Sequence, residues 1–178
     1  MTKTIRFITL LACTILLIAC SPKYDWRVVH GTPIPFEVLL PAKPASMTRP
    51  VDLGAAKVEM TMTAAEVDGV TFAVGAATLP NAADAATALA AMKTGLVRNI
   101  NGTIKREAGE AGQAGKPGAA PFEVEAIGTS ASNKSNEIVL LARFFAKDAR
   151  VYQVVVLGPP QKIERAEAEN FFSSFKPD

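Results

Sequence analysis

Two acidic side chains in one short segment come closest to a catalytic pair by type and spacing. Glu123 and Glu125 alternate with Val124 and Ala126, and side chains two positions apart in a strand share a face. Glycoside hydrolysis uses two carboxyl groups about 5 to 9.5 Å apart, one of which donates a proton. The apolar residues on the opposite face favour a solvated face for the glutamates, so a hydrolase is only a distant alternative.

A single histidine limits the other chemistry open to this chain. His30 is the only histidine. The processed chain that we expect, described below, keeps no free cysteine thiol, so a His/Cys zinc site and a Cys/His dyad are excluded. A Ser/His/acid triad would have to use His30, which has no nucleophile-elbow sequence near it. The sequence therefore predicts no catalytic residue, no metal site, no cofactor and no enzymatic activity.

Glycine recurs at every third position across residues 109–118. Collagen needs that period over a long run in three chains. A phosphate loop fails because Glu110 and Pro117 stand where glycine and Ser/Thr are required. We expect a mobile surface loop, and we assign no function to the chance glycosylation sequons at Asn101 and Asn133.

Residues 1–19 have the layout of an export signal. Lys3 and Arg6 give a cationic start, and a largely apolar region follows over residues 7–19. This region is shorter than the roughly 20 apolar residues that cross a hydrocarbon layer of about 30 Å. We therefore expect a signal peptide that is removed.

The end of this segment, Leu17-Ile18-Ala19-Cys20, resembles the bacterial lipobox, with an apolar residue three positions before the cysteine and a small residue directly before it. The resemblance implies lipidation at Cys20, by a diacylglyceryl thioether and by acylation of the new amino group, for example with palmitate. Two acyl chains already give stable membrane anchoring. An ordinary signal peptide with a chance cysteine is the alternative. In many bacterial lipoproteins an aspartate directly after the lipidated cysteine favours retention in the inner membrane. Ser21 stands at this position, so the resemblance implies that the protein is anchored at the periplasmic face of the outer membrane rather than in the inner membrane.

Removal of the signal changes the charge and the cysteine count. Loss of Lys3 and Arg6 with the signal reduces the basic residues from 19 to 17, which equals the number of acidic residues. A neutral chain without basic clusters argues against nucleic acid as a partner. Cys13 is removed and Cys20 carries lipid, so no disulfide is expected. The domain must be held by its core alone, which a chain of this length can provide.

We expect residues 20–25 to form a short tether and residues 26–178 to form one globular domain. Six residue steps separate Cys20 from Trp26 and span at most about 20 Å. Trp26 either touches the headgroup zone, where Trp is favoured, or is the first core residue. We favour the core.

Alternation of apolar and polar residues predicts an antiparallel sheet of about six to eight strands. Asp68-Gly69 between two alternating runs indicates a hairpin, and Lys147-Asp148-Ala149 joins another pair. The predicted strands are residues 36–40, 47–52, 58–64, 70–74, 103–107, 122–128, 138–146 and 151–157.

Two helices complete the predicted α+β fold. The first is capped by Asn81, has Asp84 in its first turn and ends at Gly102. The second covers residues 163–175 and exposes Glu164, Glu167 and Glu169 near its start. Apolar spacing of three and four predicts the buried residues Ala82, Ala85, Leu89, Met92, Leu96 and Ile100 in the first helix and Phe171, Phe172 and Phe175 in the second.

The order of elements resembles the PsbP/Mog1-like domains. Phe36-Glu37-Val38-Leu39-Leu40-Pro41 is similar to their early strand, residues 152–158 to their last strand, and residues 168–175 to their final helix. The resemblance implies an α/β sandwich, an antiparallel sheet flanked by helices, used as a binding or assembly module. It carries over no catalytic residue.

These patterns together predict a membrane-tethered periplasmic lipoprotein of the cell envelope. The lipid bilayer would be its partner through acylated Cys20. Its first expected function is non-enzymatic binding or assembly of an envelope protein. The alternative is a carrier that holds a small apolar ligand or lipid between sheet and helix.

Overall fold

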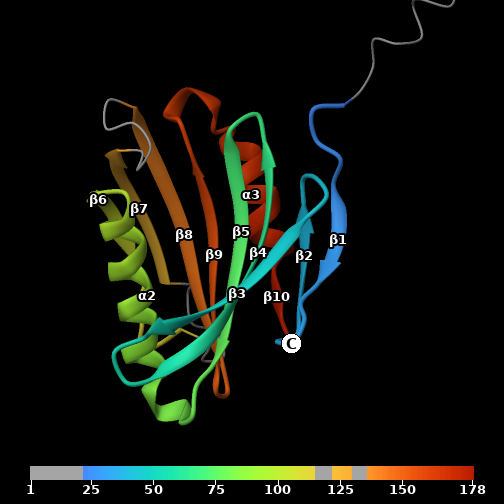
Figure 1. Cartoon of the computed structure of the whole chain (residues 1–178). Helices are drawn as coiled ribbons and strands as arrows, with labels where there is room; N and C mark the ends of the chain where they lie inside the picture. The colour runs from blue at the N-terminus through green and yellow to red at the C-terminus, as the bar shows by residue number, and fades with distance from the viewer. Residues whose placement is uncertain (1–21, 115–121, 130–135) are drawn as a thin grey trace, which may run out of the picture.

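The computed structural model describes residues 22–114, 122–129 and 136–178. It has the expected α+β class, with antiparallel strands in two sheets and two α-helices (Figure 1). Cys20, Ser21, Asn133 and the last part of the glycine-rich loop lie outside the described residues. The expectations that concern them stay predictions.

The larger sheet confirms the predicted number of strands. Its order is β3-β4-β5-β9-β8-β7-β6, and each strand is antiparallel to its neighbours. Central β9 is buried on both faces. The strands are β3 (Ala45–Asp52), β4 (Lys57–Val67), β5 (Val70–Thr78), β6 (Thr103–Ala108), β7 (Phe122–Thr129), β8 (Glu137–Lys147) and β9 (Arg150–Gly158).

A second sheet of three strands was not predicted. It has the order β1-β2-β10, with β1 at Arg27–His30, β2 at Phe36–Leu40 and β10 at Lys176–Pro177. Residues 36–40 are a strand as expected, but they belong to this smaller sheet. β1 is largely exposed and β10 has only two residues, so neither shows the apolar alternation on which strand prediction depends.

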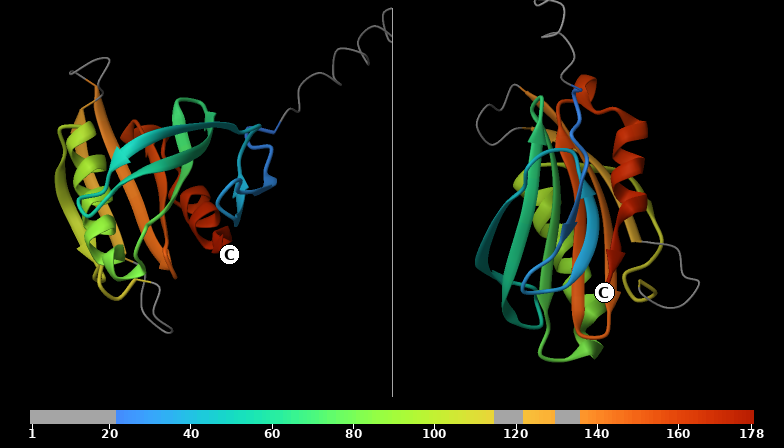
Figure 2. Two further views of the ribbon diagram at one scale, coloured as in Figure 1. Left: turned by 60° about the horizontal axis from the view of Figure 1, so that its bottom comes forward. Right: turned by 90° about the vertical axis from the view of Figure 1, so that its right-hand side faces the viewer.

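The elements form three layers (Figure 2). Helix α2 (Ala85–Asn99) covers one face of the large sheet by packing on β7, β8 and β9. Helix α3 (Arg165–Ser174) and the small sheet cover the other face. The large sheet is therefore buried between two apolar clusters.

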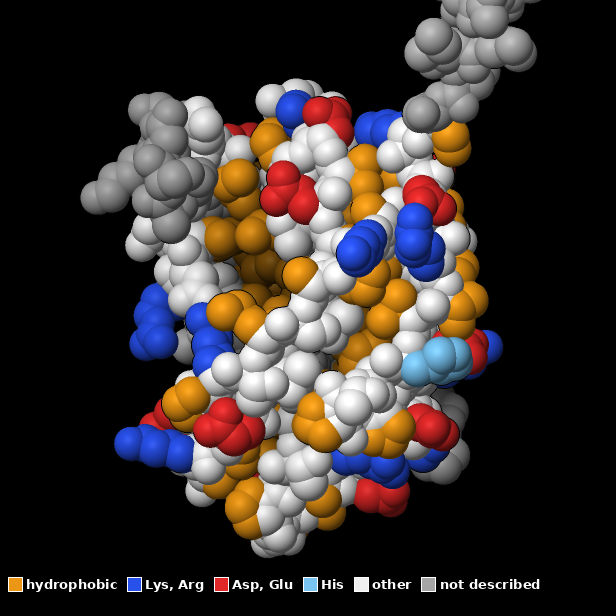
Figure 3. Space-filling model, turned by 45° about the vertical axis from the view of Figure 1, so that its right-hand side comes forward, with side chains coloured by type: hydrophobic (Ala, Val, Ile, Leu, Met, Phe, Trp, Pro, Cys, Tyr) orange, Lys and Arg blue, Asp and Glu red, His pale blue; other side chains and the backbone are white. Residues whose placement is uncertain are grey.

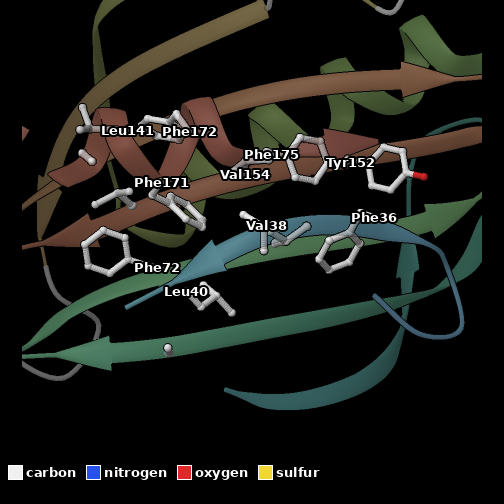
Figure 4. Packing of buried hydrophobic residues seen from close by; sticks show 14 of the residues in the cluster. Phe36, Val38, Leu40, Phe72, Leu141, Tyr152, Val154, Phe171, Phe172 and Phe175 are labelled. Carbon is white, nitrogen blue, oxygen red and sulfur yellow. The ribbon is translucent and has the colours of Figure 1, made fainter. Parts of the chain in front are cut away.

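The cluster on the α3 side is rich in aromatic rings. Figure 4 shows Phe36 and Val38 of β2 in one cluster with the rings of Phe171 and Phe175. The centroids of Phe36 and Phe175 are 5.9 Å apart. The phenolic hydroxyl of buried Tyr152 donates to the Pro35 carbonyl at 3.0 Å. Phe171, Phe172 and Phe175 are all buried, as predicted.

Helix α2 starts later than expected. Asn81 caps a 3-10 turn, η2 (Ala82–Asp84), by accepting from the Ala83 N–H at 3.1 Å. Ala82 is therefore exposed, and its predicted burial is wrong. Asp84 is the N-cap of α2 rather than a first-turn residue.

The other end of α2 is closed by two residues. Asn101 takes the left-handed conformation, with φ of 47°, and the Gly102 N–H donates to the Val97 carbonyl at 2.8 Å. This is a Schellman-type end. Helix α2 was expected to end at Gly102, and Asn101 and Gly102 together end it.

Both clusters consist of residues between Tyr24 and Phe175. The described residues thus contain two extensive apolar clusters of the kind on which an independent domain depends. Within the described part of the chain, no helix is long and apolar enough to span a membrane.

Candidate functional site

A pocket of about 190 Å³ beside α3 contains the predicted carboxylate pair. β7 supplies Glu123 and Glu125, β8 supplies Arg143, and α3 supplies Arg165 and Glu169. The two β7 glutamates share a face, as alternation predicts. Their side chains are only 27% and 25% exposed, because α3 lies over them. They are half-buried rather than on the open solvated face that the sequence favoured.

Every glutamate of this pocket is paired with an arginine. Arg143 Nε lies 2.6 Å from Glu123 Oε1, and the terminal nitrogens of Arg143 donate to the two Glu169 oxygens at 3.1 and 2.8 Å. Arg165 donates to Glu125 at 2.6 and 3.3 Å. Such two-pronged arginine pairs fix both partners in position.

These ion pairs favour the charged forms of Glu169 and Arg165. The hydrogen bonds from Arg143 lower the pKa of Glu169, and the hydrogen bond to Glu125 raises the pKa of Arg165. A glycosidase instead needs one carboxyl that keeps its proton near neutral pH. The Arg143 guanidinium also lies 4.7 Å from the centroid of the Phe172 ring. We therefore interpret this cluster as a clamp that holds α3 on the sheet.

His30 does not line this pocket. It is exposed at the end of β1, opposite Glu37 of β2. Across residues 22–114, 122–129 and 136–178, no three His, Asp, Glu or Cys side chains are grouped so that they could hold a metal ion.

A second hollow lies on the opposite face of the large sheet, between the β3–β4 hairpin and α2. The tip of the hairpin at Gly54 packs against Thr87 and Ala91 of α2. Away from this contact the walls enclose a groove of about 300 Å³. Figure 3 shows a hollow with hydrophobic walls left of the centre of this view. The apolar lining consists of Val51, Leu53, Met60, Met62, Met92 and Leu96.

Methionine is concentrated in this groove. The chain has five methionines, and Met60, Met62 and Met92 line the groove. Met47 pairs with Met62 across β3 and β4 and is 63% exposed. Methionine side chains are flexible and polarisable, so they adapt to apolar molecules of varied shape. Gln153, buried on the central strand β9, adds a polar group whose Nε2 lies 3.5 Å from Met62 Sδ.

Gly95 leaves the α2 wall of the groove without a side chain. Glycine inside a helix costs roughly 0.5–1 kcal/mol relative to alanine. Its φ is not in the left-handed region. A Cβ at this position would meet none of the described atoms outside its own helix within 4 Å. Neither packing nor backbone conformation requires glycine here, and the missing side chain widens the groove.

The N-terminal segment is attached to the domain before Trp26. Lys23 and the Tyr24 hydroxyl both donate to Glu164 Oε1. Trp26 stacks on Tyr24 and packs edge-on against Phe72, with ring centroids 5.7 and 6.1 Å apart. Trp26 is partly buried against the cluster on the α3 side, and Tyr24 packs there two residues before it, so Trp26 is not the first residue that contacts the core.

Comparison with known proteins does not assign the chain to a family, because neither a scan of protein-family models nor a search of curated proteins finds a match. The PsbP/Mog1 and lipobox resemblances therefore rest on the residues that carry them.

Sequence reasoning missed the groove. Met60 and Met62 at alternate positions and Gly95 within a predicted helix were the available signals. Their meaning depends on the β3–β4 hairpin lying beside α2, which the sequence pattern does not reveal.

Proposed function

We propose that this protein is a lipid-anchored, non-enzymatic envelope protein that binds the apolar chain of a small ligand in the groove between β3–β4 and α2. The observation that carries the proposal is the open, methionine-lined groove with Gly95 in its wall. The groove lies between sheet and helix, as the carrier alternative from the sequence requires. The layered order of elements supports a PsbP/Mog1-like fold as part of this proposal.

The size and lining of the groove fit this function. Small-molecule sites are mostly apolar hollows of roughly 300–1,000 Å³ with a few polar groups. A groove of about 300 Å³ is at the lower end of this range. It suits one hydrocarbon chain better than a lipid with two.

Anchoring at Cys20 would hold the domain close to a membrane. Lys23 is already attached to Glu164, and the three residue steps from Cys20 span at most about 10 Å. The end of the domain that faces the bilayer would then contain Lys23, Glu164 and the neighbouring Lys162–Asp68 pair, whose charged atoms are 3.1 Å apart. Because Ser21 favours the outer membrane, we propose that the domain lies on its periplasmic face, next to a supply of acyl chains.

The test uses a substitution that fills the groove without disturbing the core. Gly95→Leu adds a side chain where a Cβ meets only open space. Native mass spectrometry of residues 22–178 mixed with dodecan-1-ol should show one bound molecule in the wild type and little in Gly95→Leu. The matched control is Ala90→Leu, at an exposed position of the same helix, which should bind normally. Equal binding by all three proteins, or none by the wild type, would overturn the proposal.

A further inference from the structure

The arginines of the described chain fall into two groups. Five of the seven have an acidic partner within 4.0 Å, namely Arg27, Arg106, Arg143, Arg150 and Arg165. Arg49 and Arg98 have no acidic partner among residues 22–114, 122–129 and 136–178. Both line the methionine groove.

The two arginines come from opposite walls of the groove. Arg49 lies on β3 opposite Met60 of β4, and Arg98 lies in the last turn of α2. Both side chains belong to exposed residues, so they stand at the rim rather than in the apolar floor.

One acidic residue shares this rim. Asp52 also lines the groove, and its Oδ1 accepts the Gly54 N–H at 2.9 Å within the hairpin tip. One carboxylate against two guanidinium groups leaves the rim with an excess positive charge. A cation at the end of a helix also suits the helix dipole, but that explanation does not extend to Arg49 on β3.

We propose that the groove binds single-chain amphiphiles with an anionic headgroup, in which Arg49 and Arg98 hold the headgroup and the methionines hold the chain. This inference rests on the proposed function and adds the chemical class of the ligand. Guanidinium groups bind carboxylates and phosphates through paired N–H donors. A free fatty acid and an anionic lysophospholipid both have one apolar chain and an anionic headgroup, so both fit this site.

The test is isothermal titration calorimetry, which measures the affinity of residues 22–178 for three probes that share a twelve-carbon chain. Dodecanoate represents fatty acids, lauroyl-lysophosphatidylglycerol represents membrane phospholipid, and dodecan-1-ol lacks the charge. The wild type should bind at least one anionic probe about tenfold more tightly than the alcohol at pH 8. The anionic probe that binds more tightly identifies the source of the ligand.

Two variants separate the headgroup from the chain. Arg49→Gln combined with Arg98→Gln should remove the preference for the anionic probe and leave the affinity for dodecan-1-ol unchanged. Arg106→Gln, at a 70% exposed arginine on β6 outside the groove, should change neither.

The outcomes distinguish the two proposals. Equal affinity of the wild type for the alcohol and both anions, or an unchanged preference in the double variant, overturns the anionic ligand and leaves the apolar groove standing. Failure of the wild type to bind dodecan-1-ol, which has the chain without the charge, overturns the proposed function itself.

Discussion

At the scale of single residues, the ion pairs beneath α3 show what sequence patterns can and cannot predict. Alternation placed Glu123 and Glu125 on one face of β7, which is confirmed. Their burial and pairing could not be predicted, because Arg143 and Arg165 come from β8 and α3, and only the packing of α3 on the sheet brings them there.

Replacement of Arg143 with methionine should lower the free energy of unfolding at pH 7 by about 1–2 kcal/mol, because Glu123 stays half-buried without its closest cation. Urea denaturation measures this change. Arg106→Met is the control. Its side chain is 70% exposed and lies 3.8 Å from Glu123, so it should change the free energy of unfolding by less than about 0.5 kcal/mol.

The same comparison predicts a pH dependence. Arg143 lowers the pKa of Glu169 in the folded protein. This contribution to stability is therefore present above the unfolded-state pKa of about 4.3 and is lost as the pH falls through the folded-state pKa. The stability difference between wild type and Arg143→Met should shrink below about pH 4. A difference that stays constant down to pH 3 would show that packing on Phe172 matters instead of charge.

At the scale of elements, local signals were sufficient where turns and periodicity agree. The β4–β5 hairpin forms as predicted, with Asp68 and Gly69 at φ of 52° and 77°, and β8–β9 also pairs as expected. The small sheet was missed because β10 forms only where the chain after α3 returns to Phe36 and Glu37. No local pattern encodes such a pairing between the ends of the domain.

Helix α2 supplies the prediction at this scale, because Gly95 is not required by packing. Gly95→Ala should raise the free energy of unfolding by about 0.5–1 kcal/mol, and Ala90→Gly, at an exposed position of the same helix, should lower it by a similar amount. Thermal or urea denaturation measures both. Destabilisation by Gly95→Ala would mean that the backbone of α2 needs glycine, so that an open groove would no longer explain this residue.

At the scale of the whole molecule, the groove arises from the path of the sheet. β3 and β4 continue beyond the strands that α2 covers, and the hairpin tip at Gly54 returns to the helix near Thr87 and Ala91 (Figure 1). Met60, Met62 and Met92 meet because of this path, although they come from β4 and α2. The envelope protein partner expected from the sequence stays a prediction, for which edge strand β3, with its exposed residues, offers a surface.

The central claim is that the methionine groove binds an apolar chain, and methyl NMR of the methionines tests it most directly. In residues 22–178 the only methionines are Met47, Met60, Met62 and Met92, so a sample labelled at the methionine methyl carbons reports on the groove and its margin. Titration with dodecanoate should shift the Met60, Met62 and Met92 signals saturably in the wild type and leave them unmoved in Gly95→Leu. Signals that do not move at saturating dodecanoate in the wild type would contradict the account.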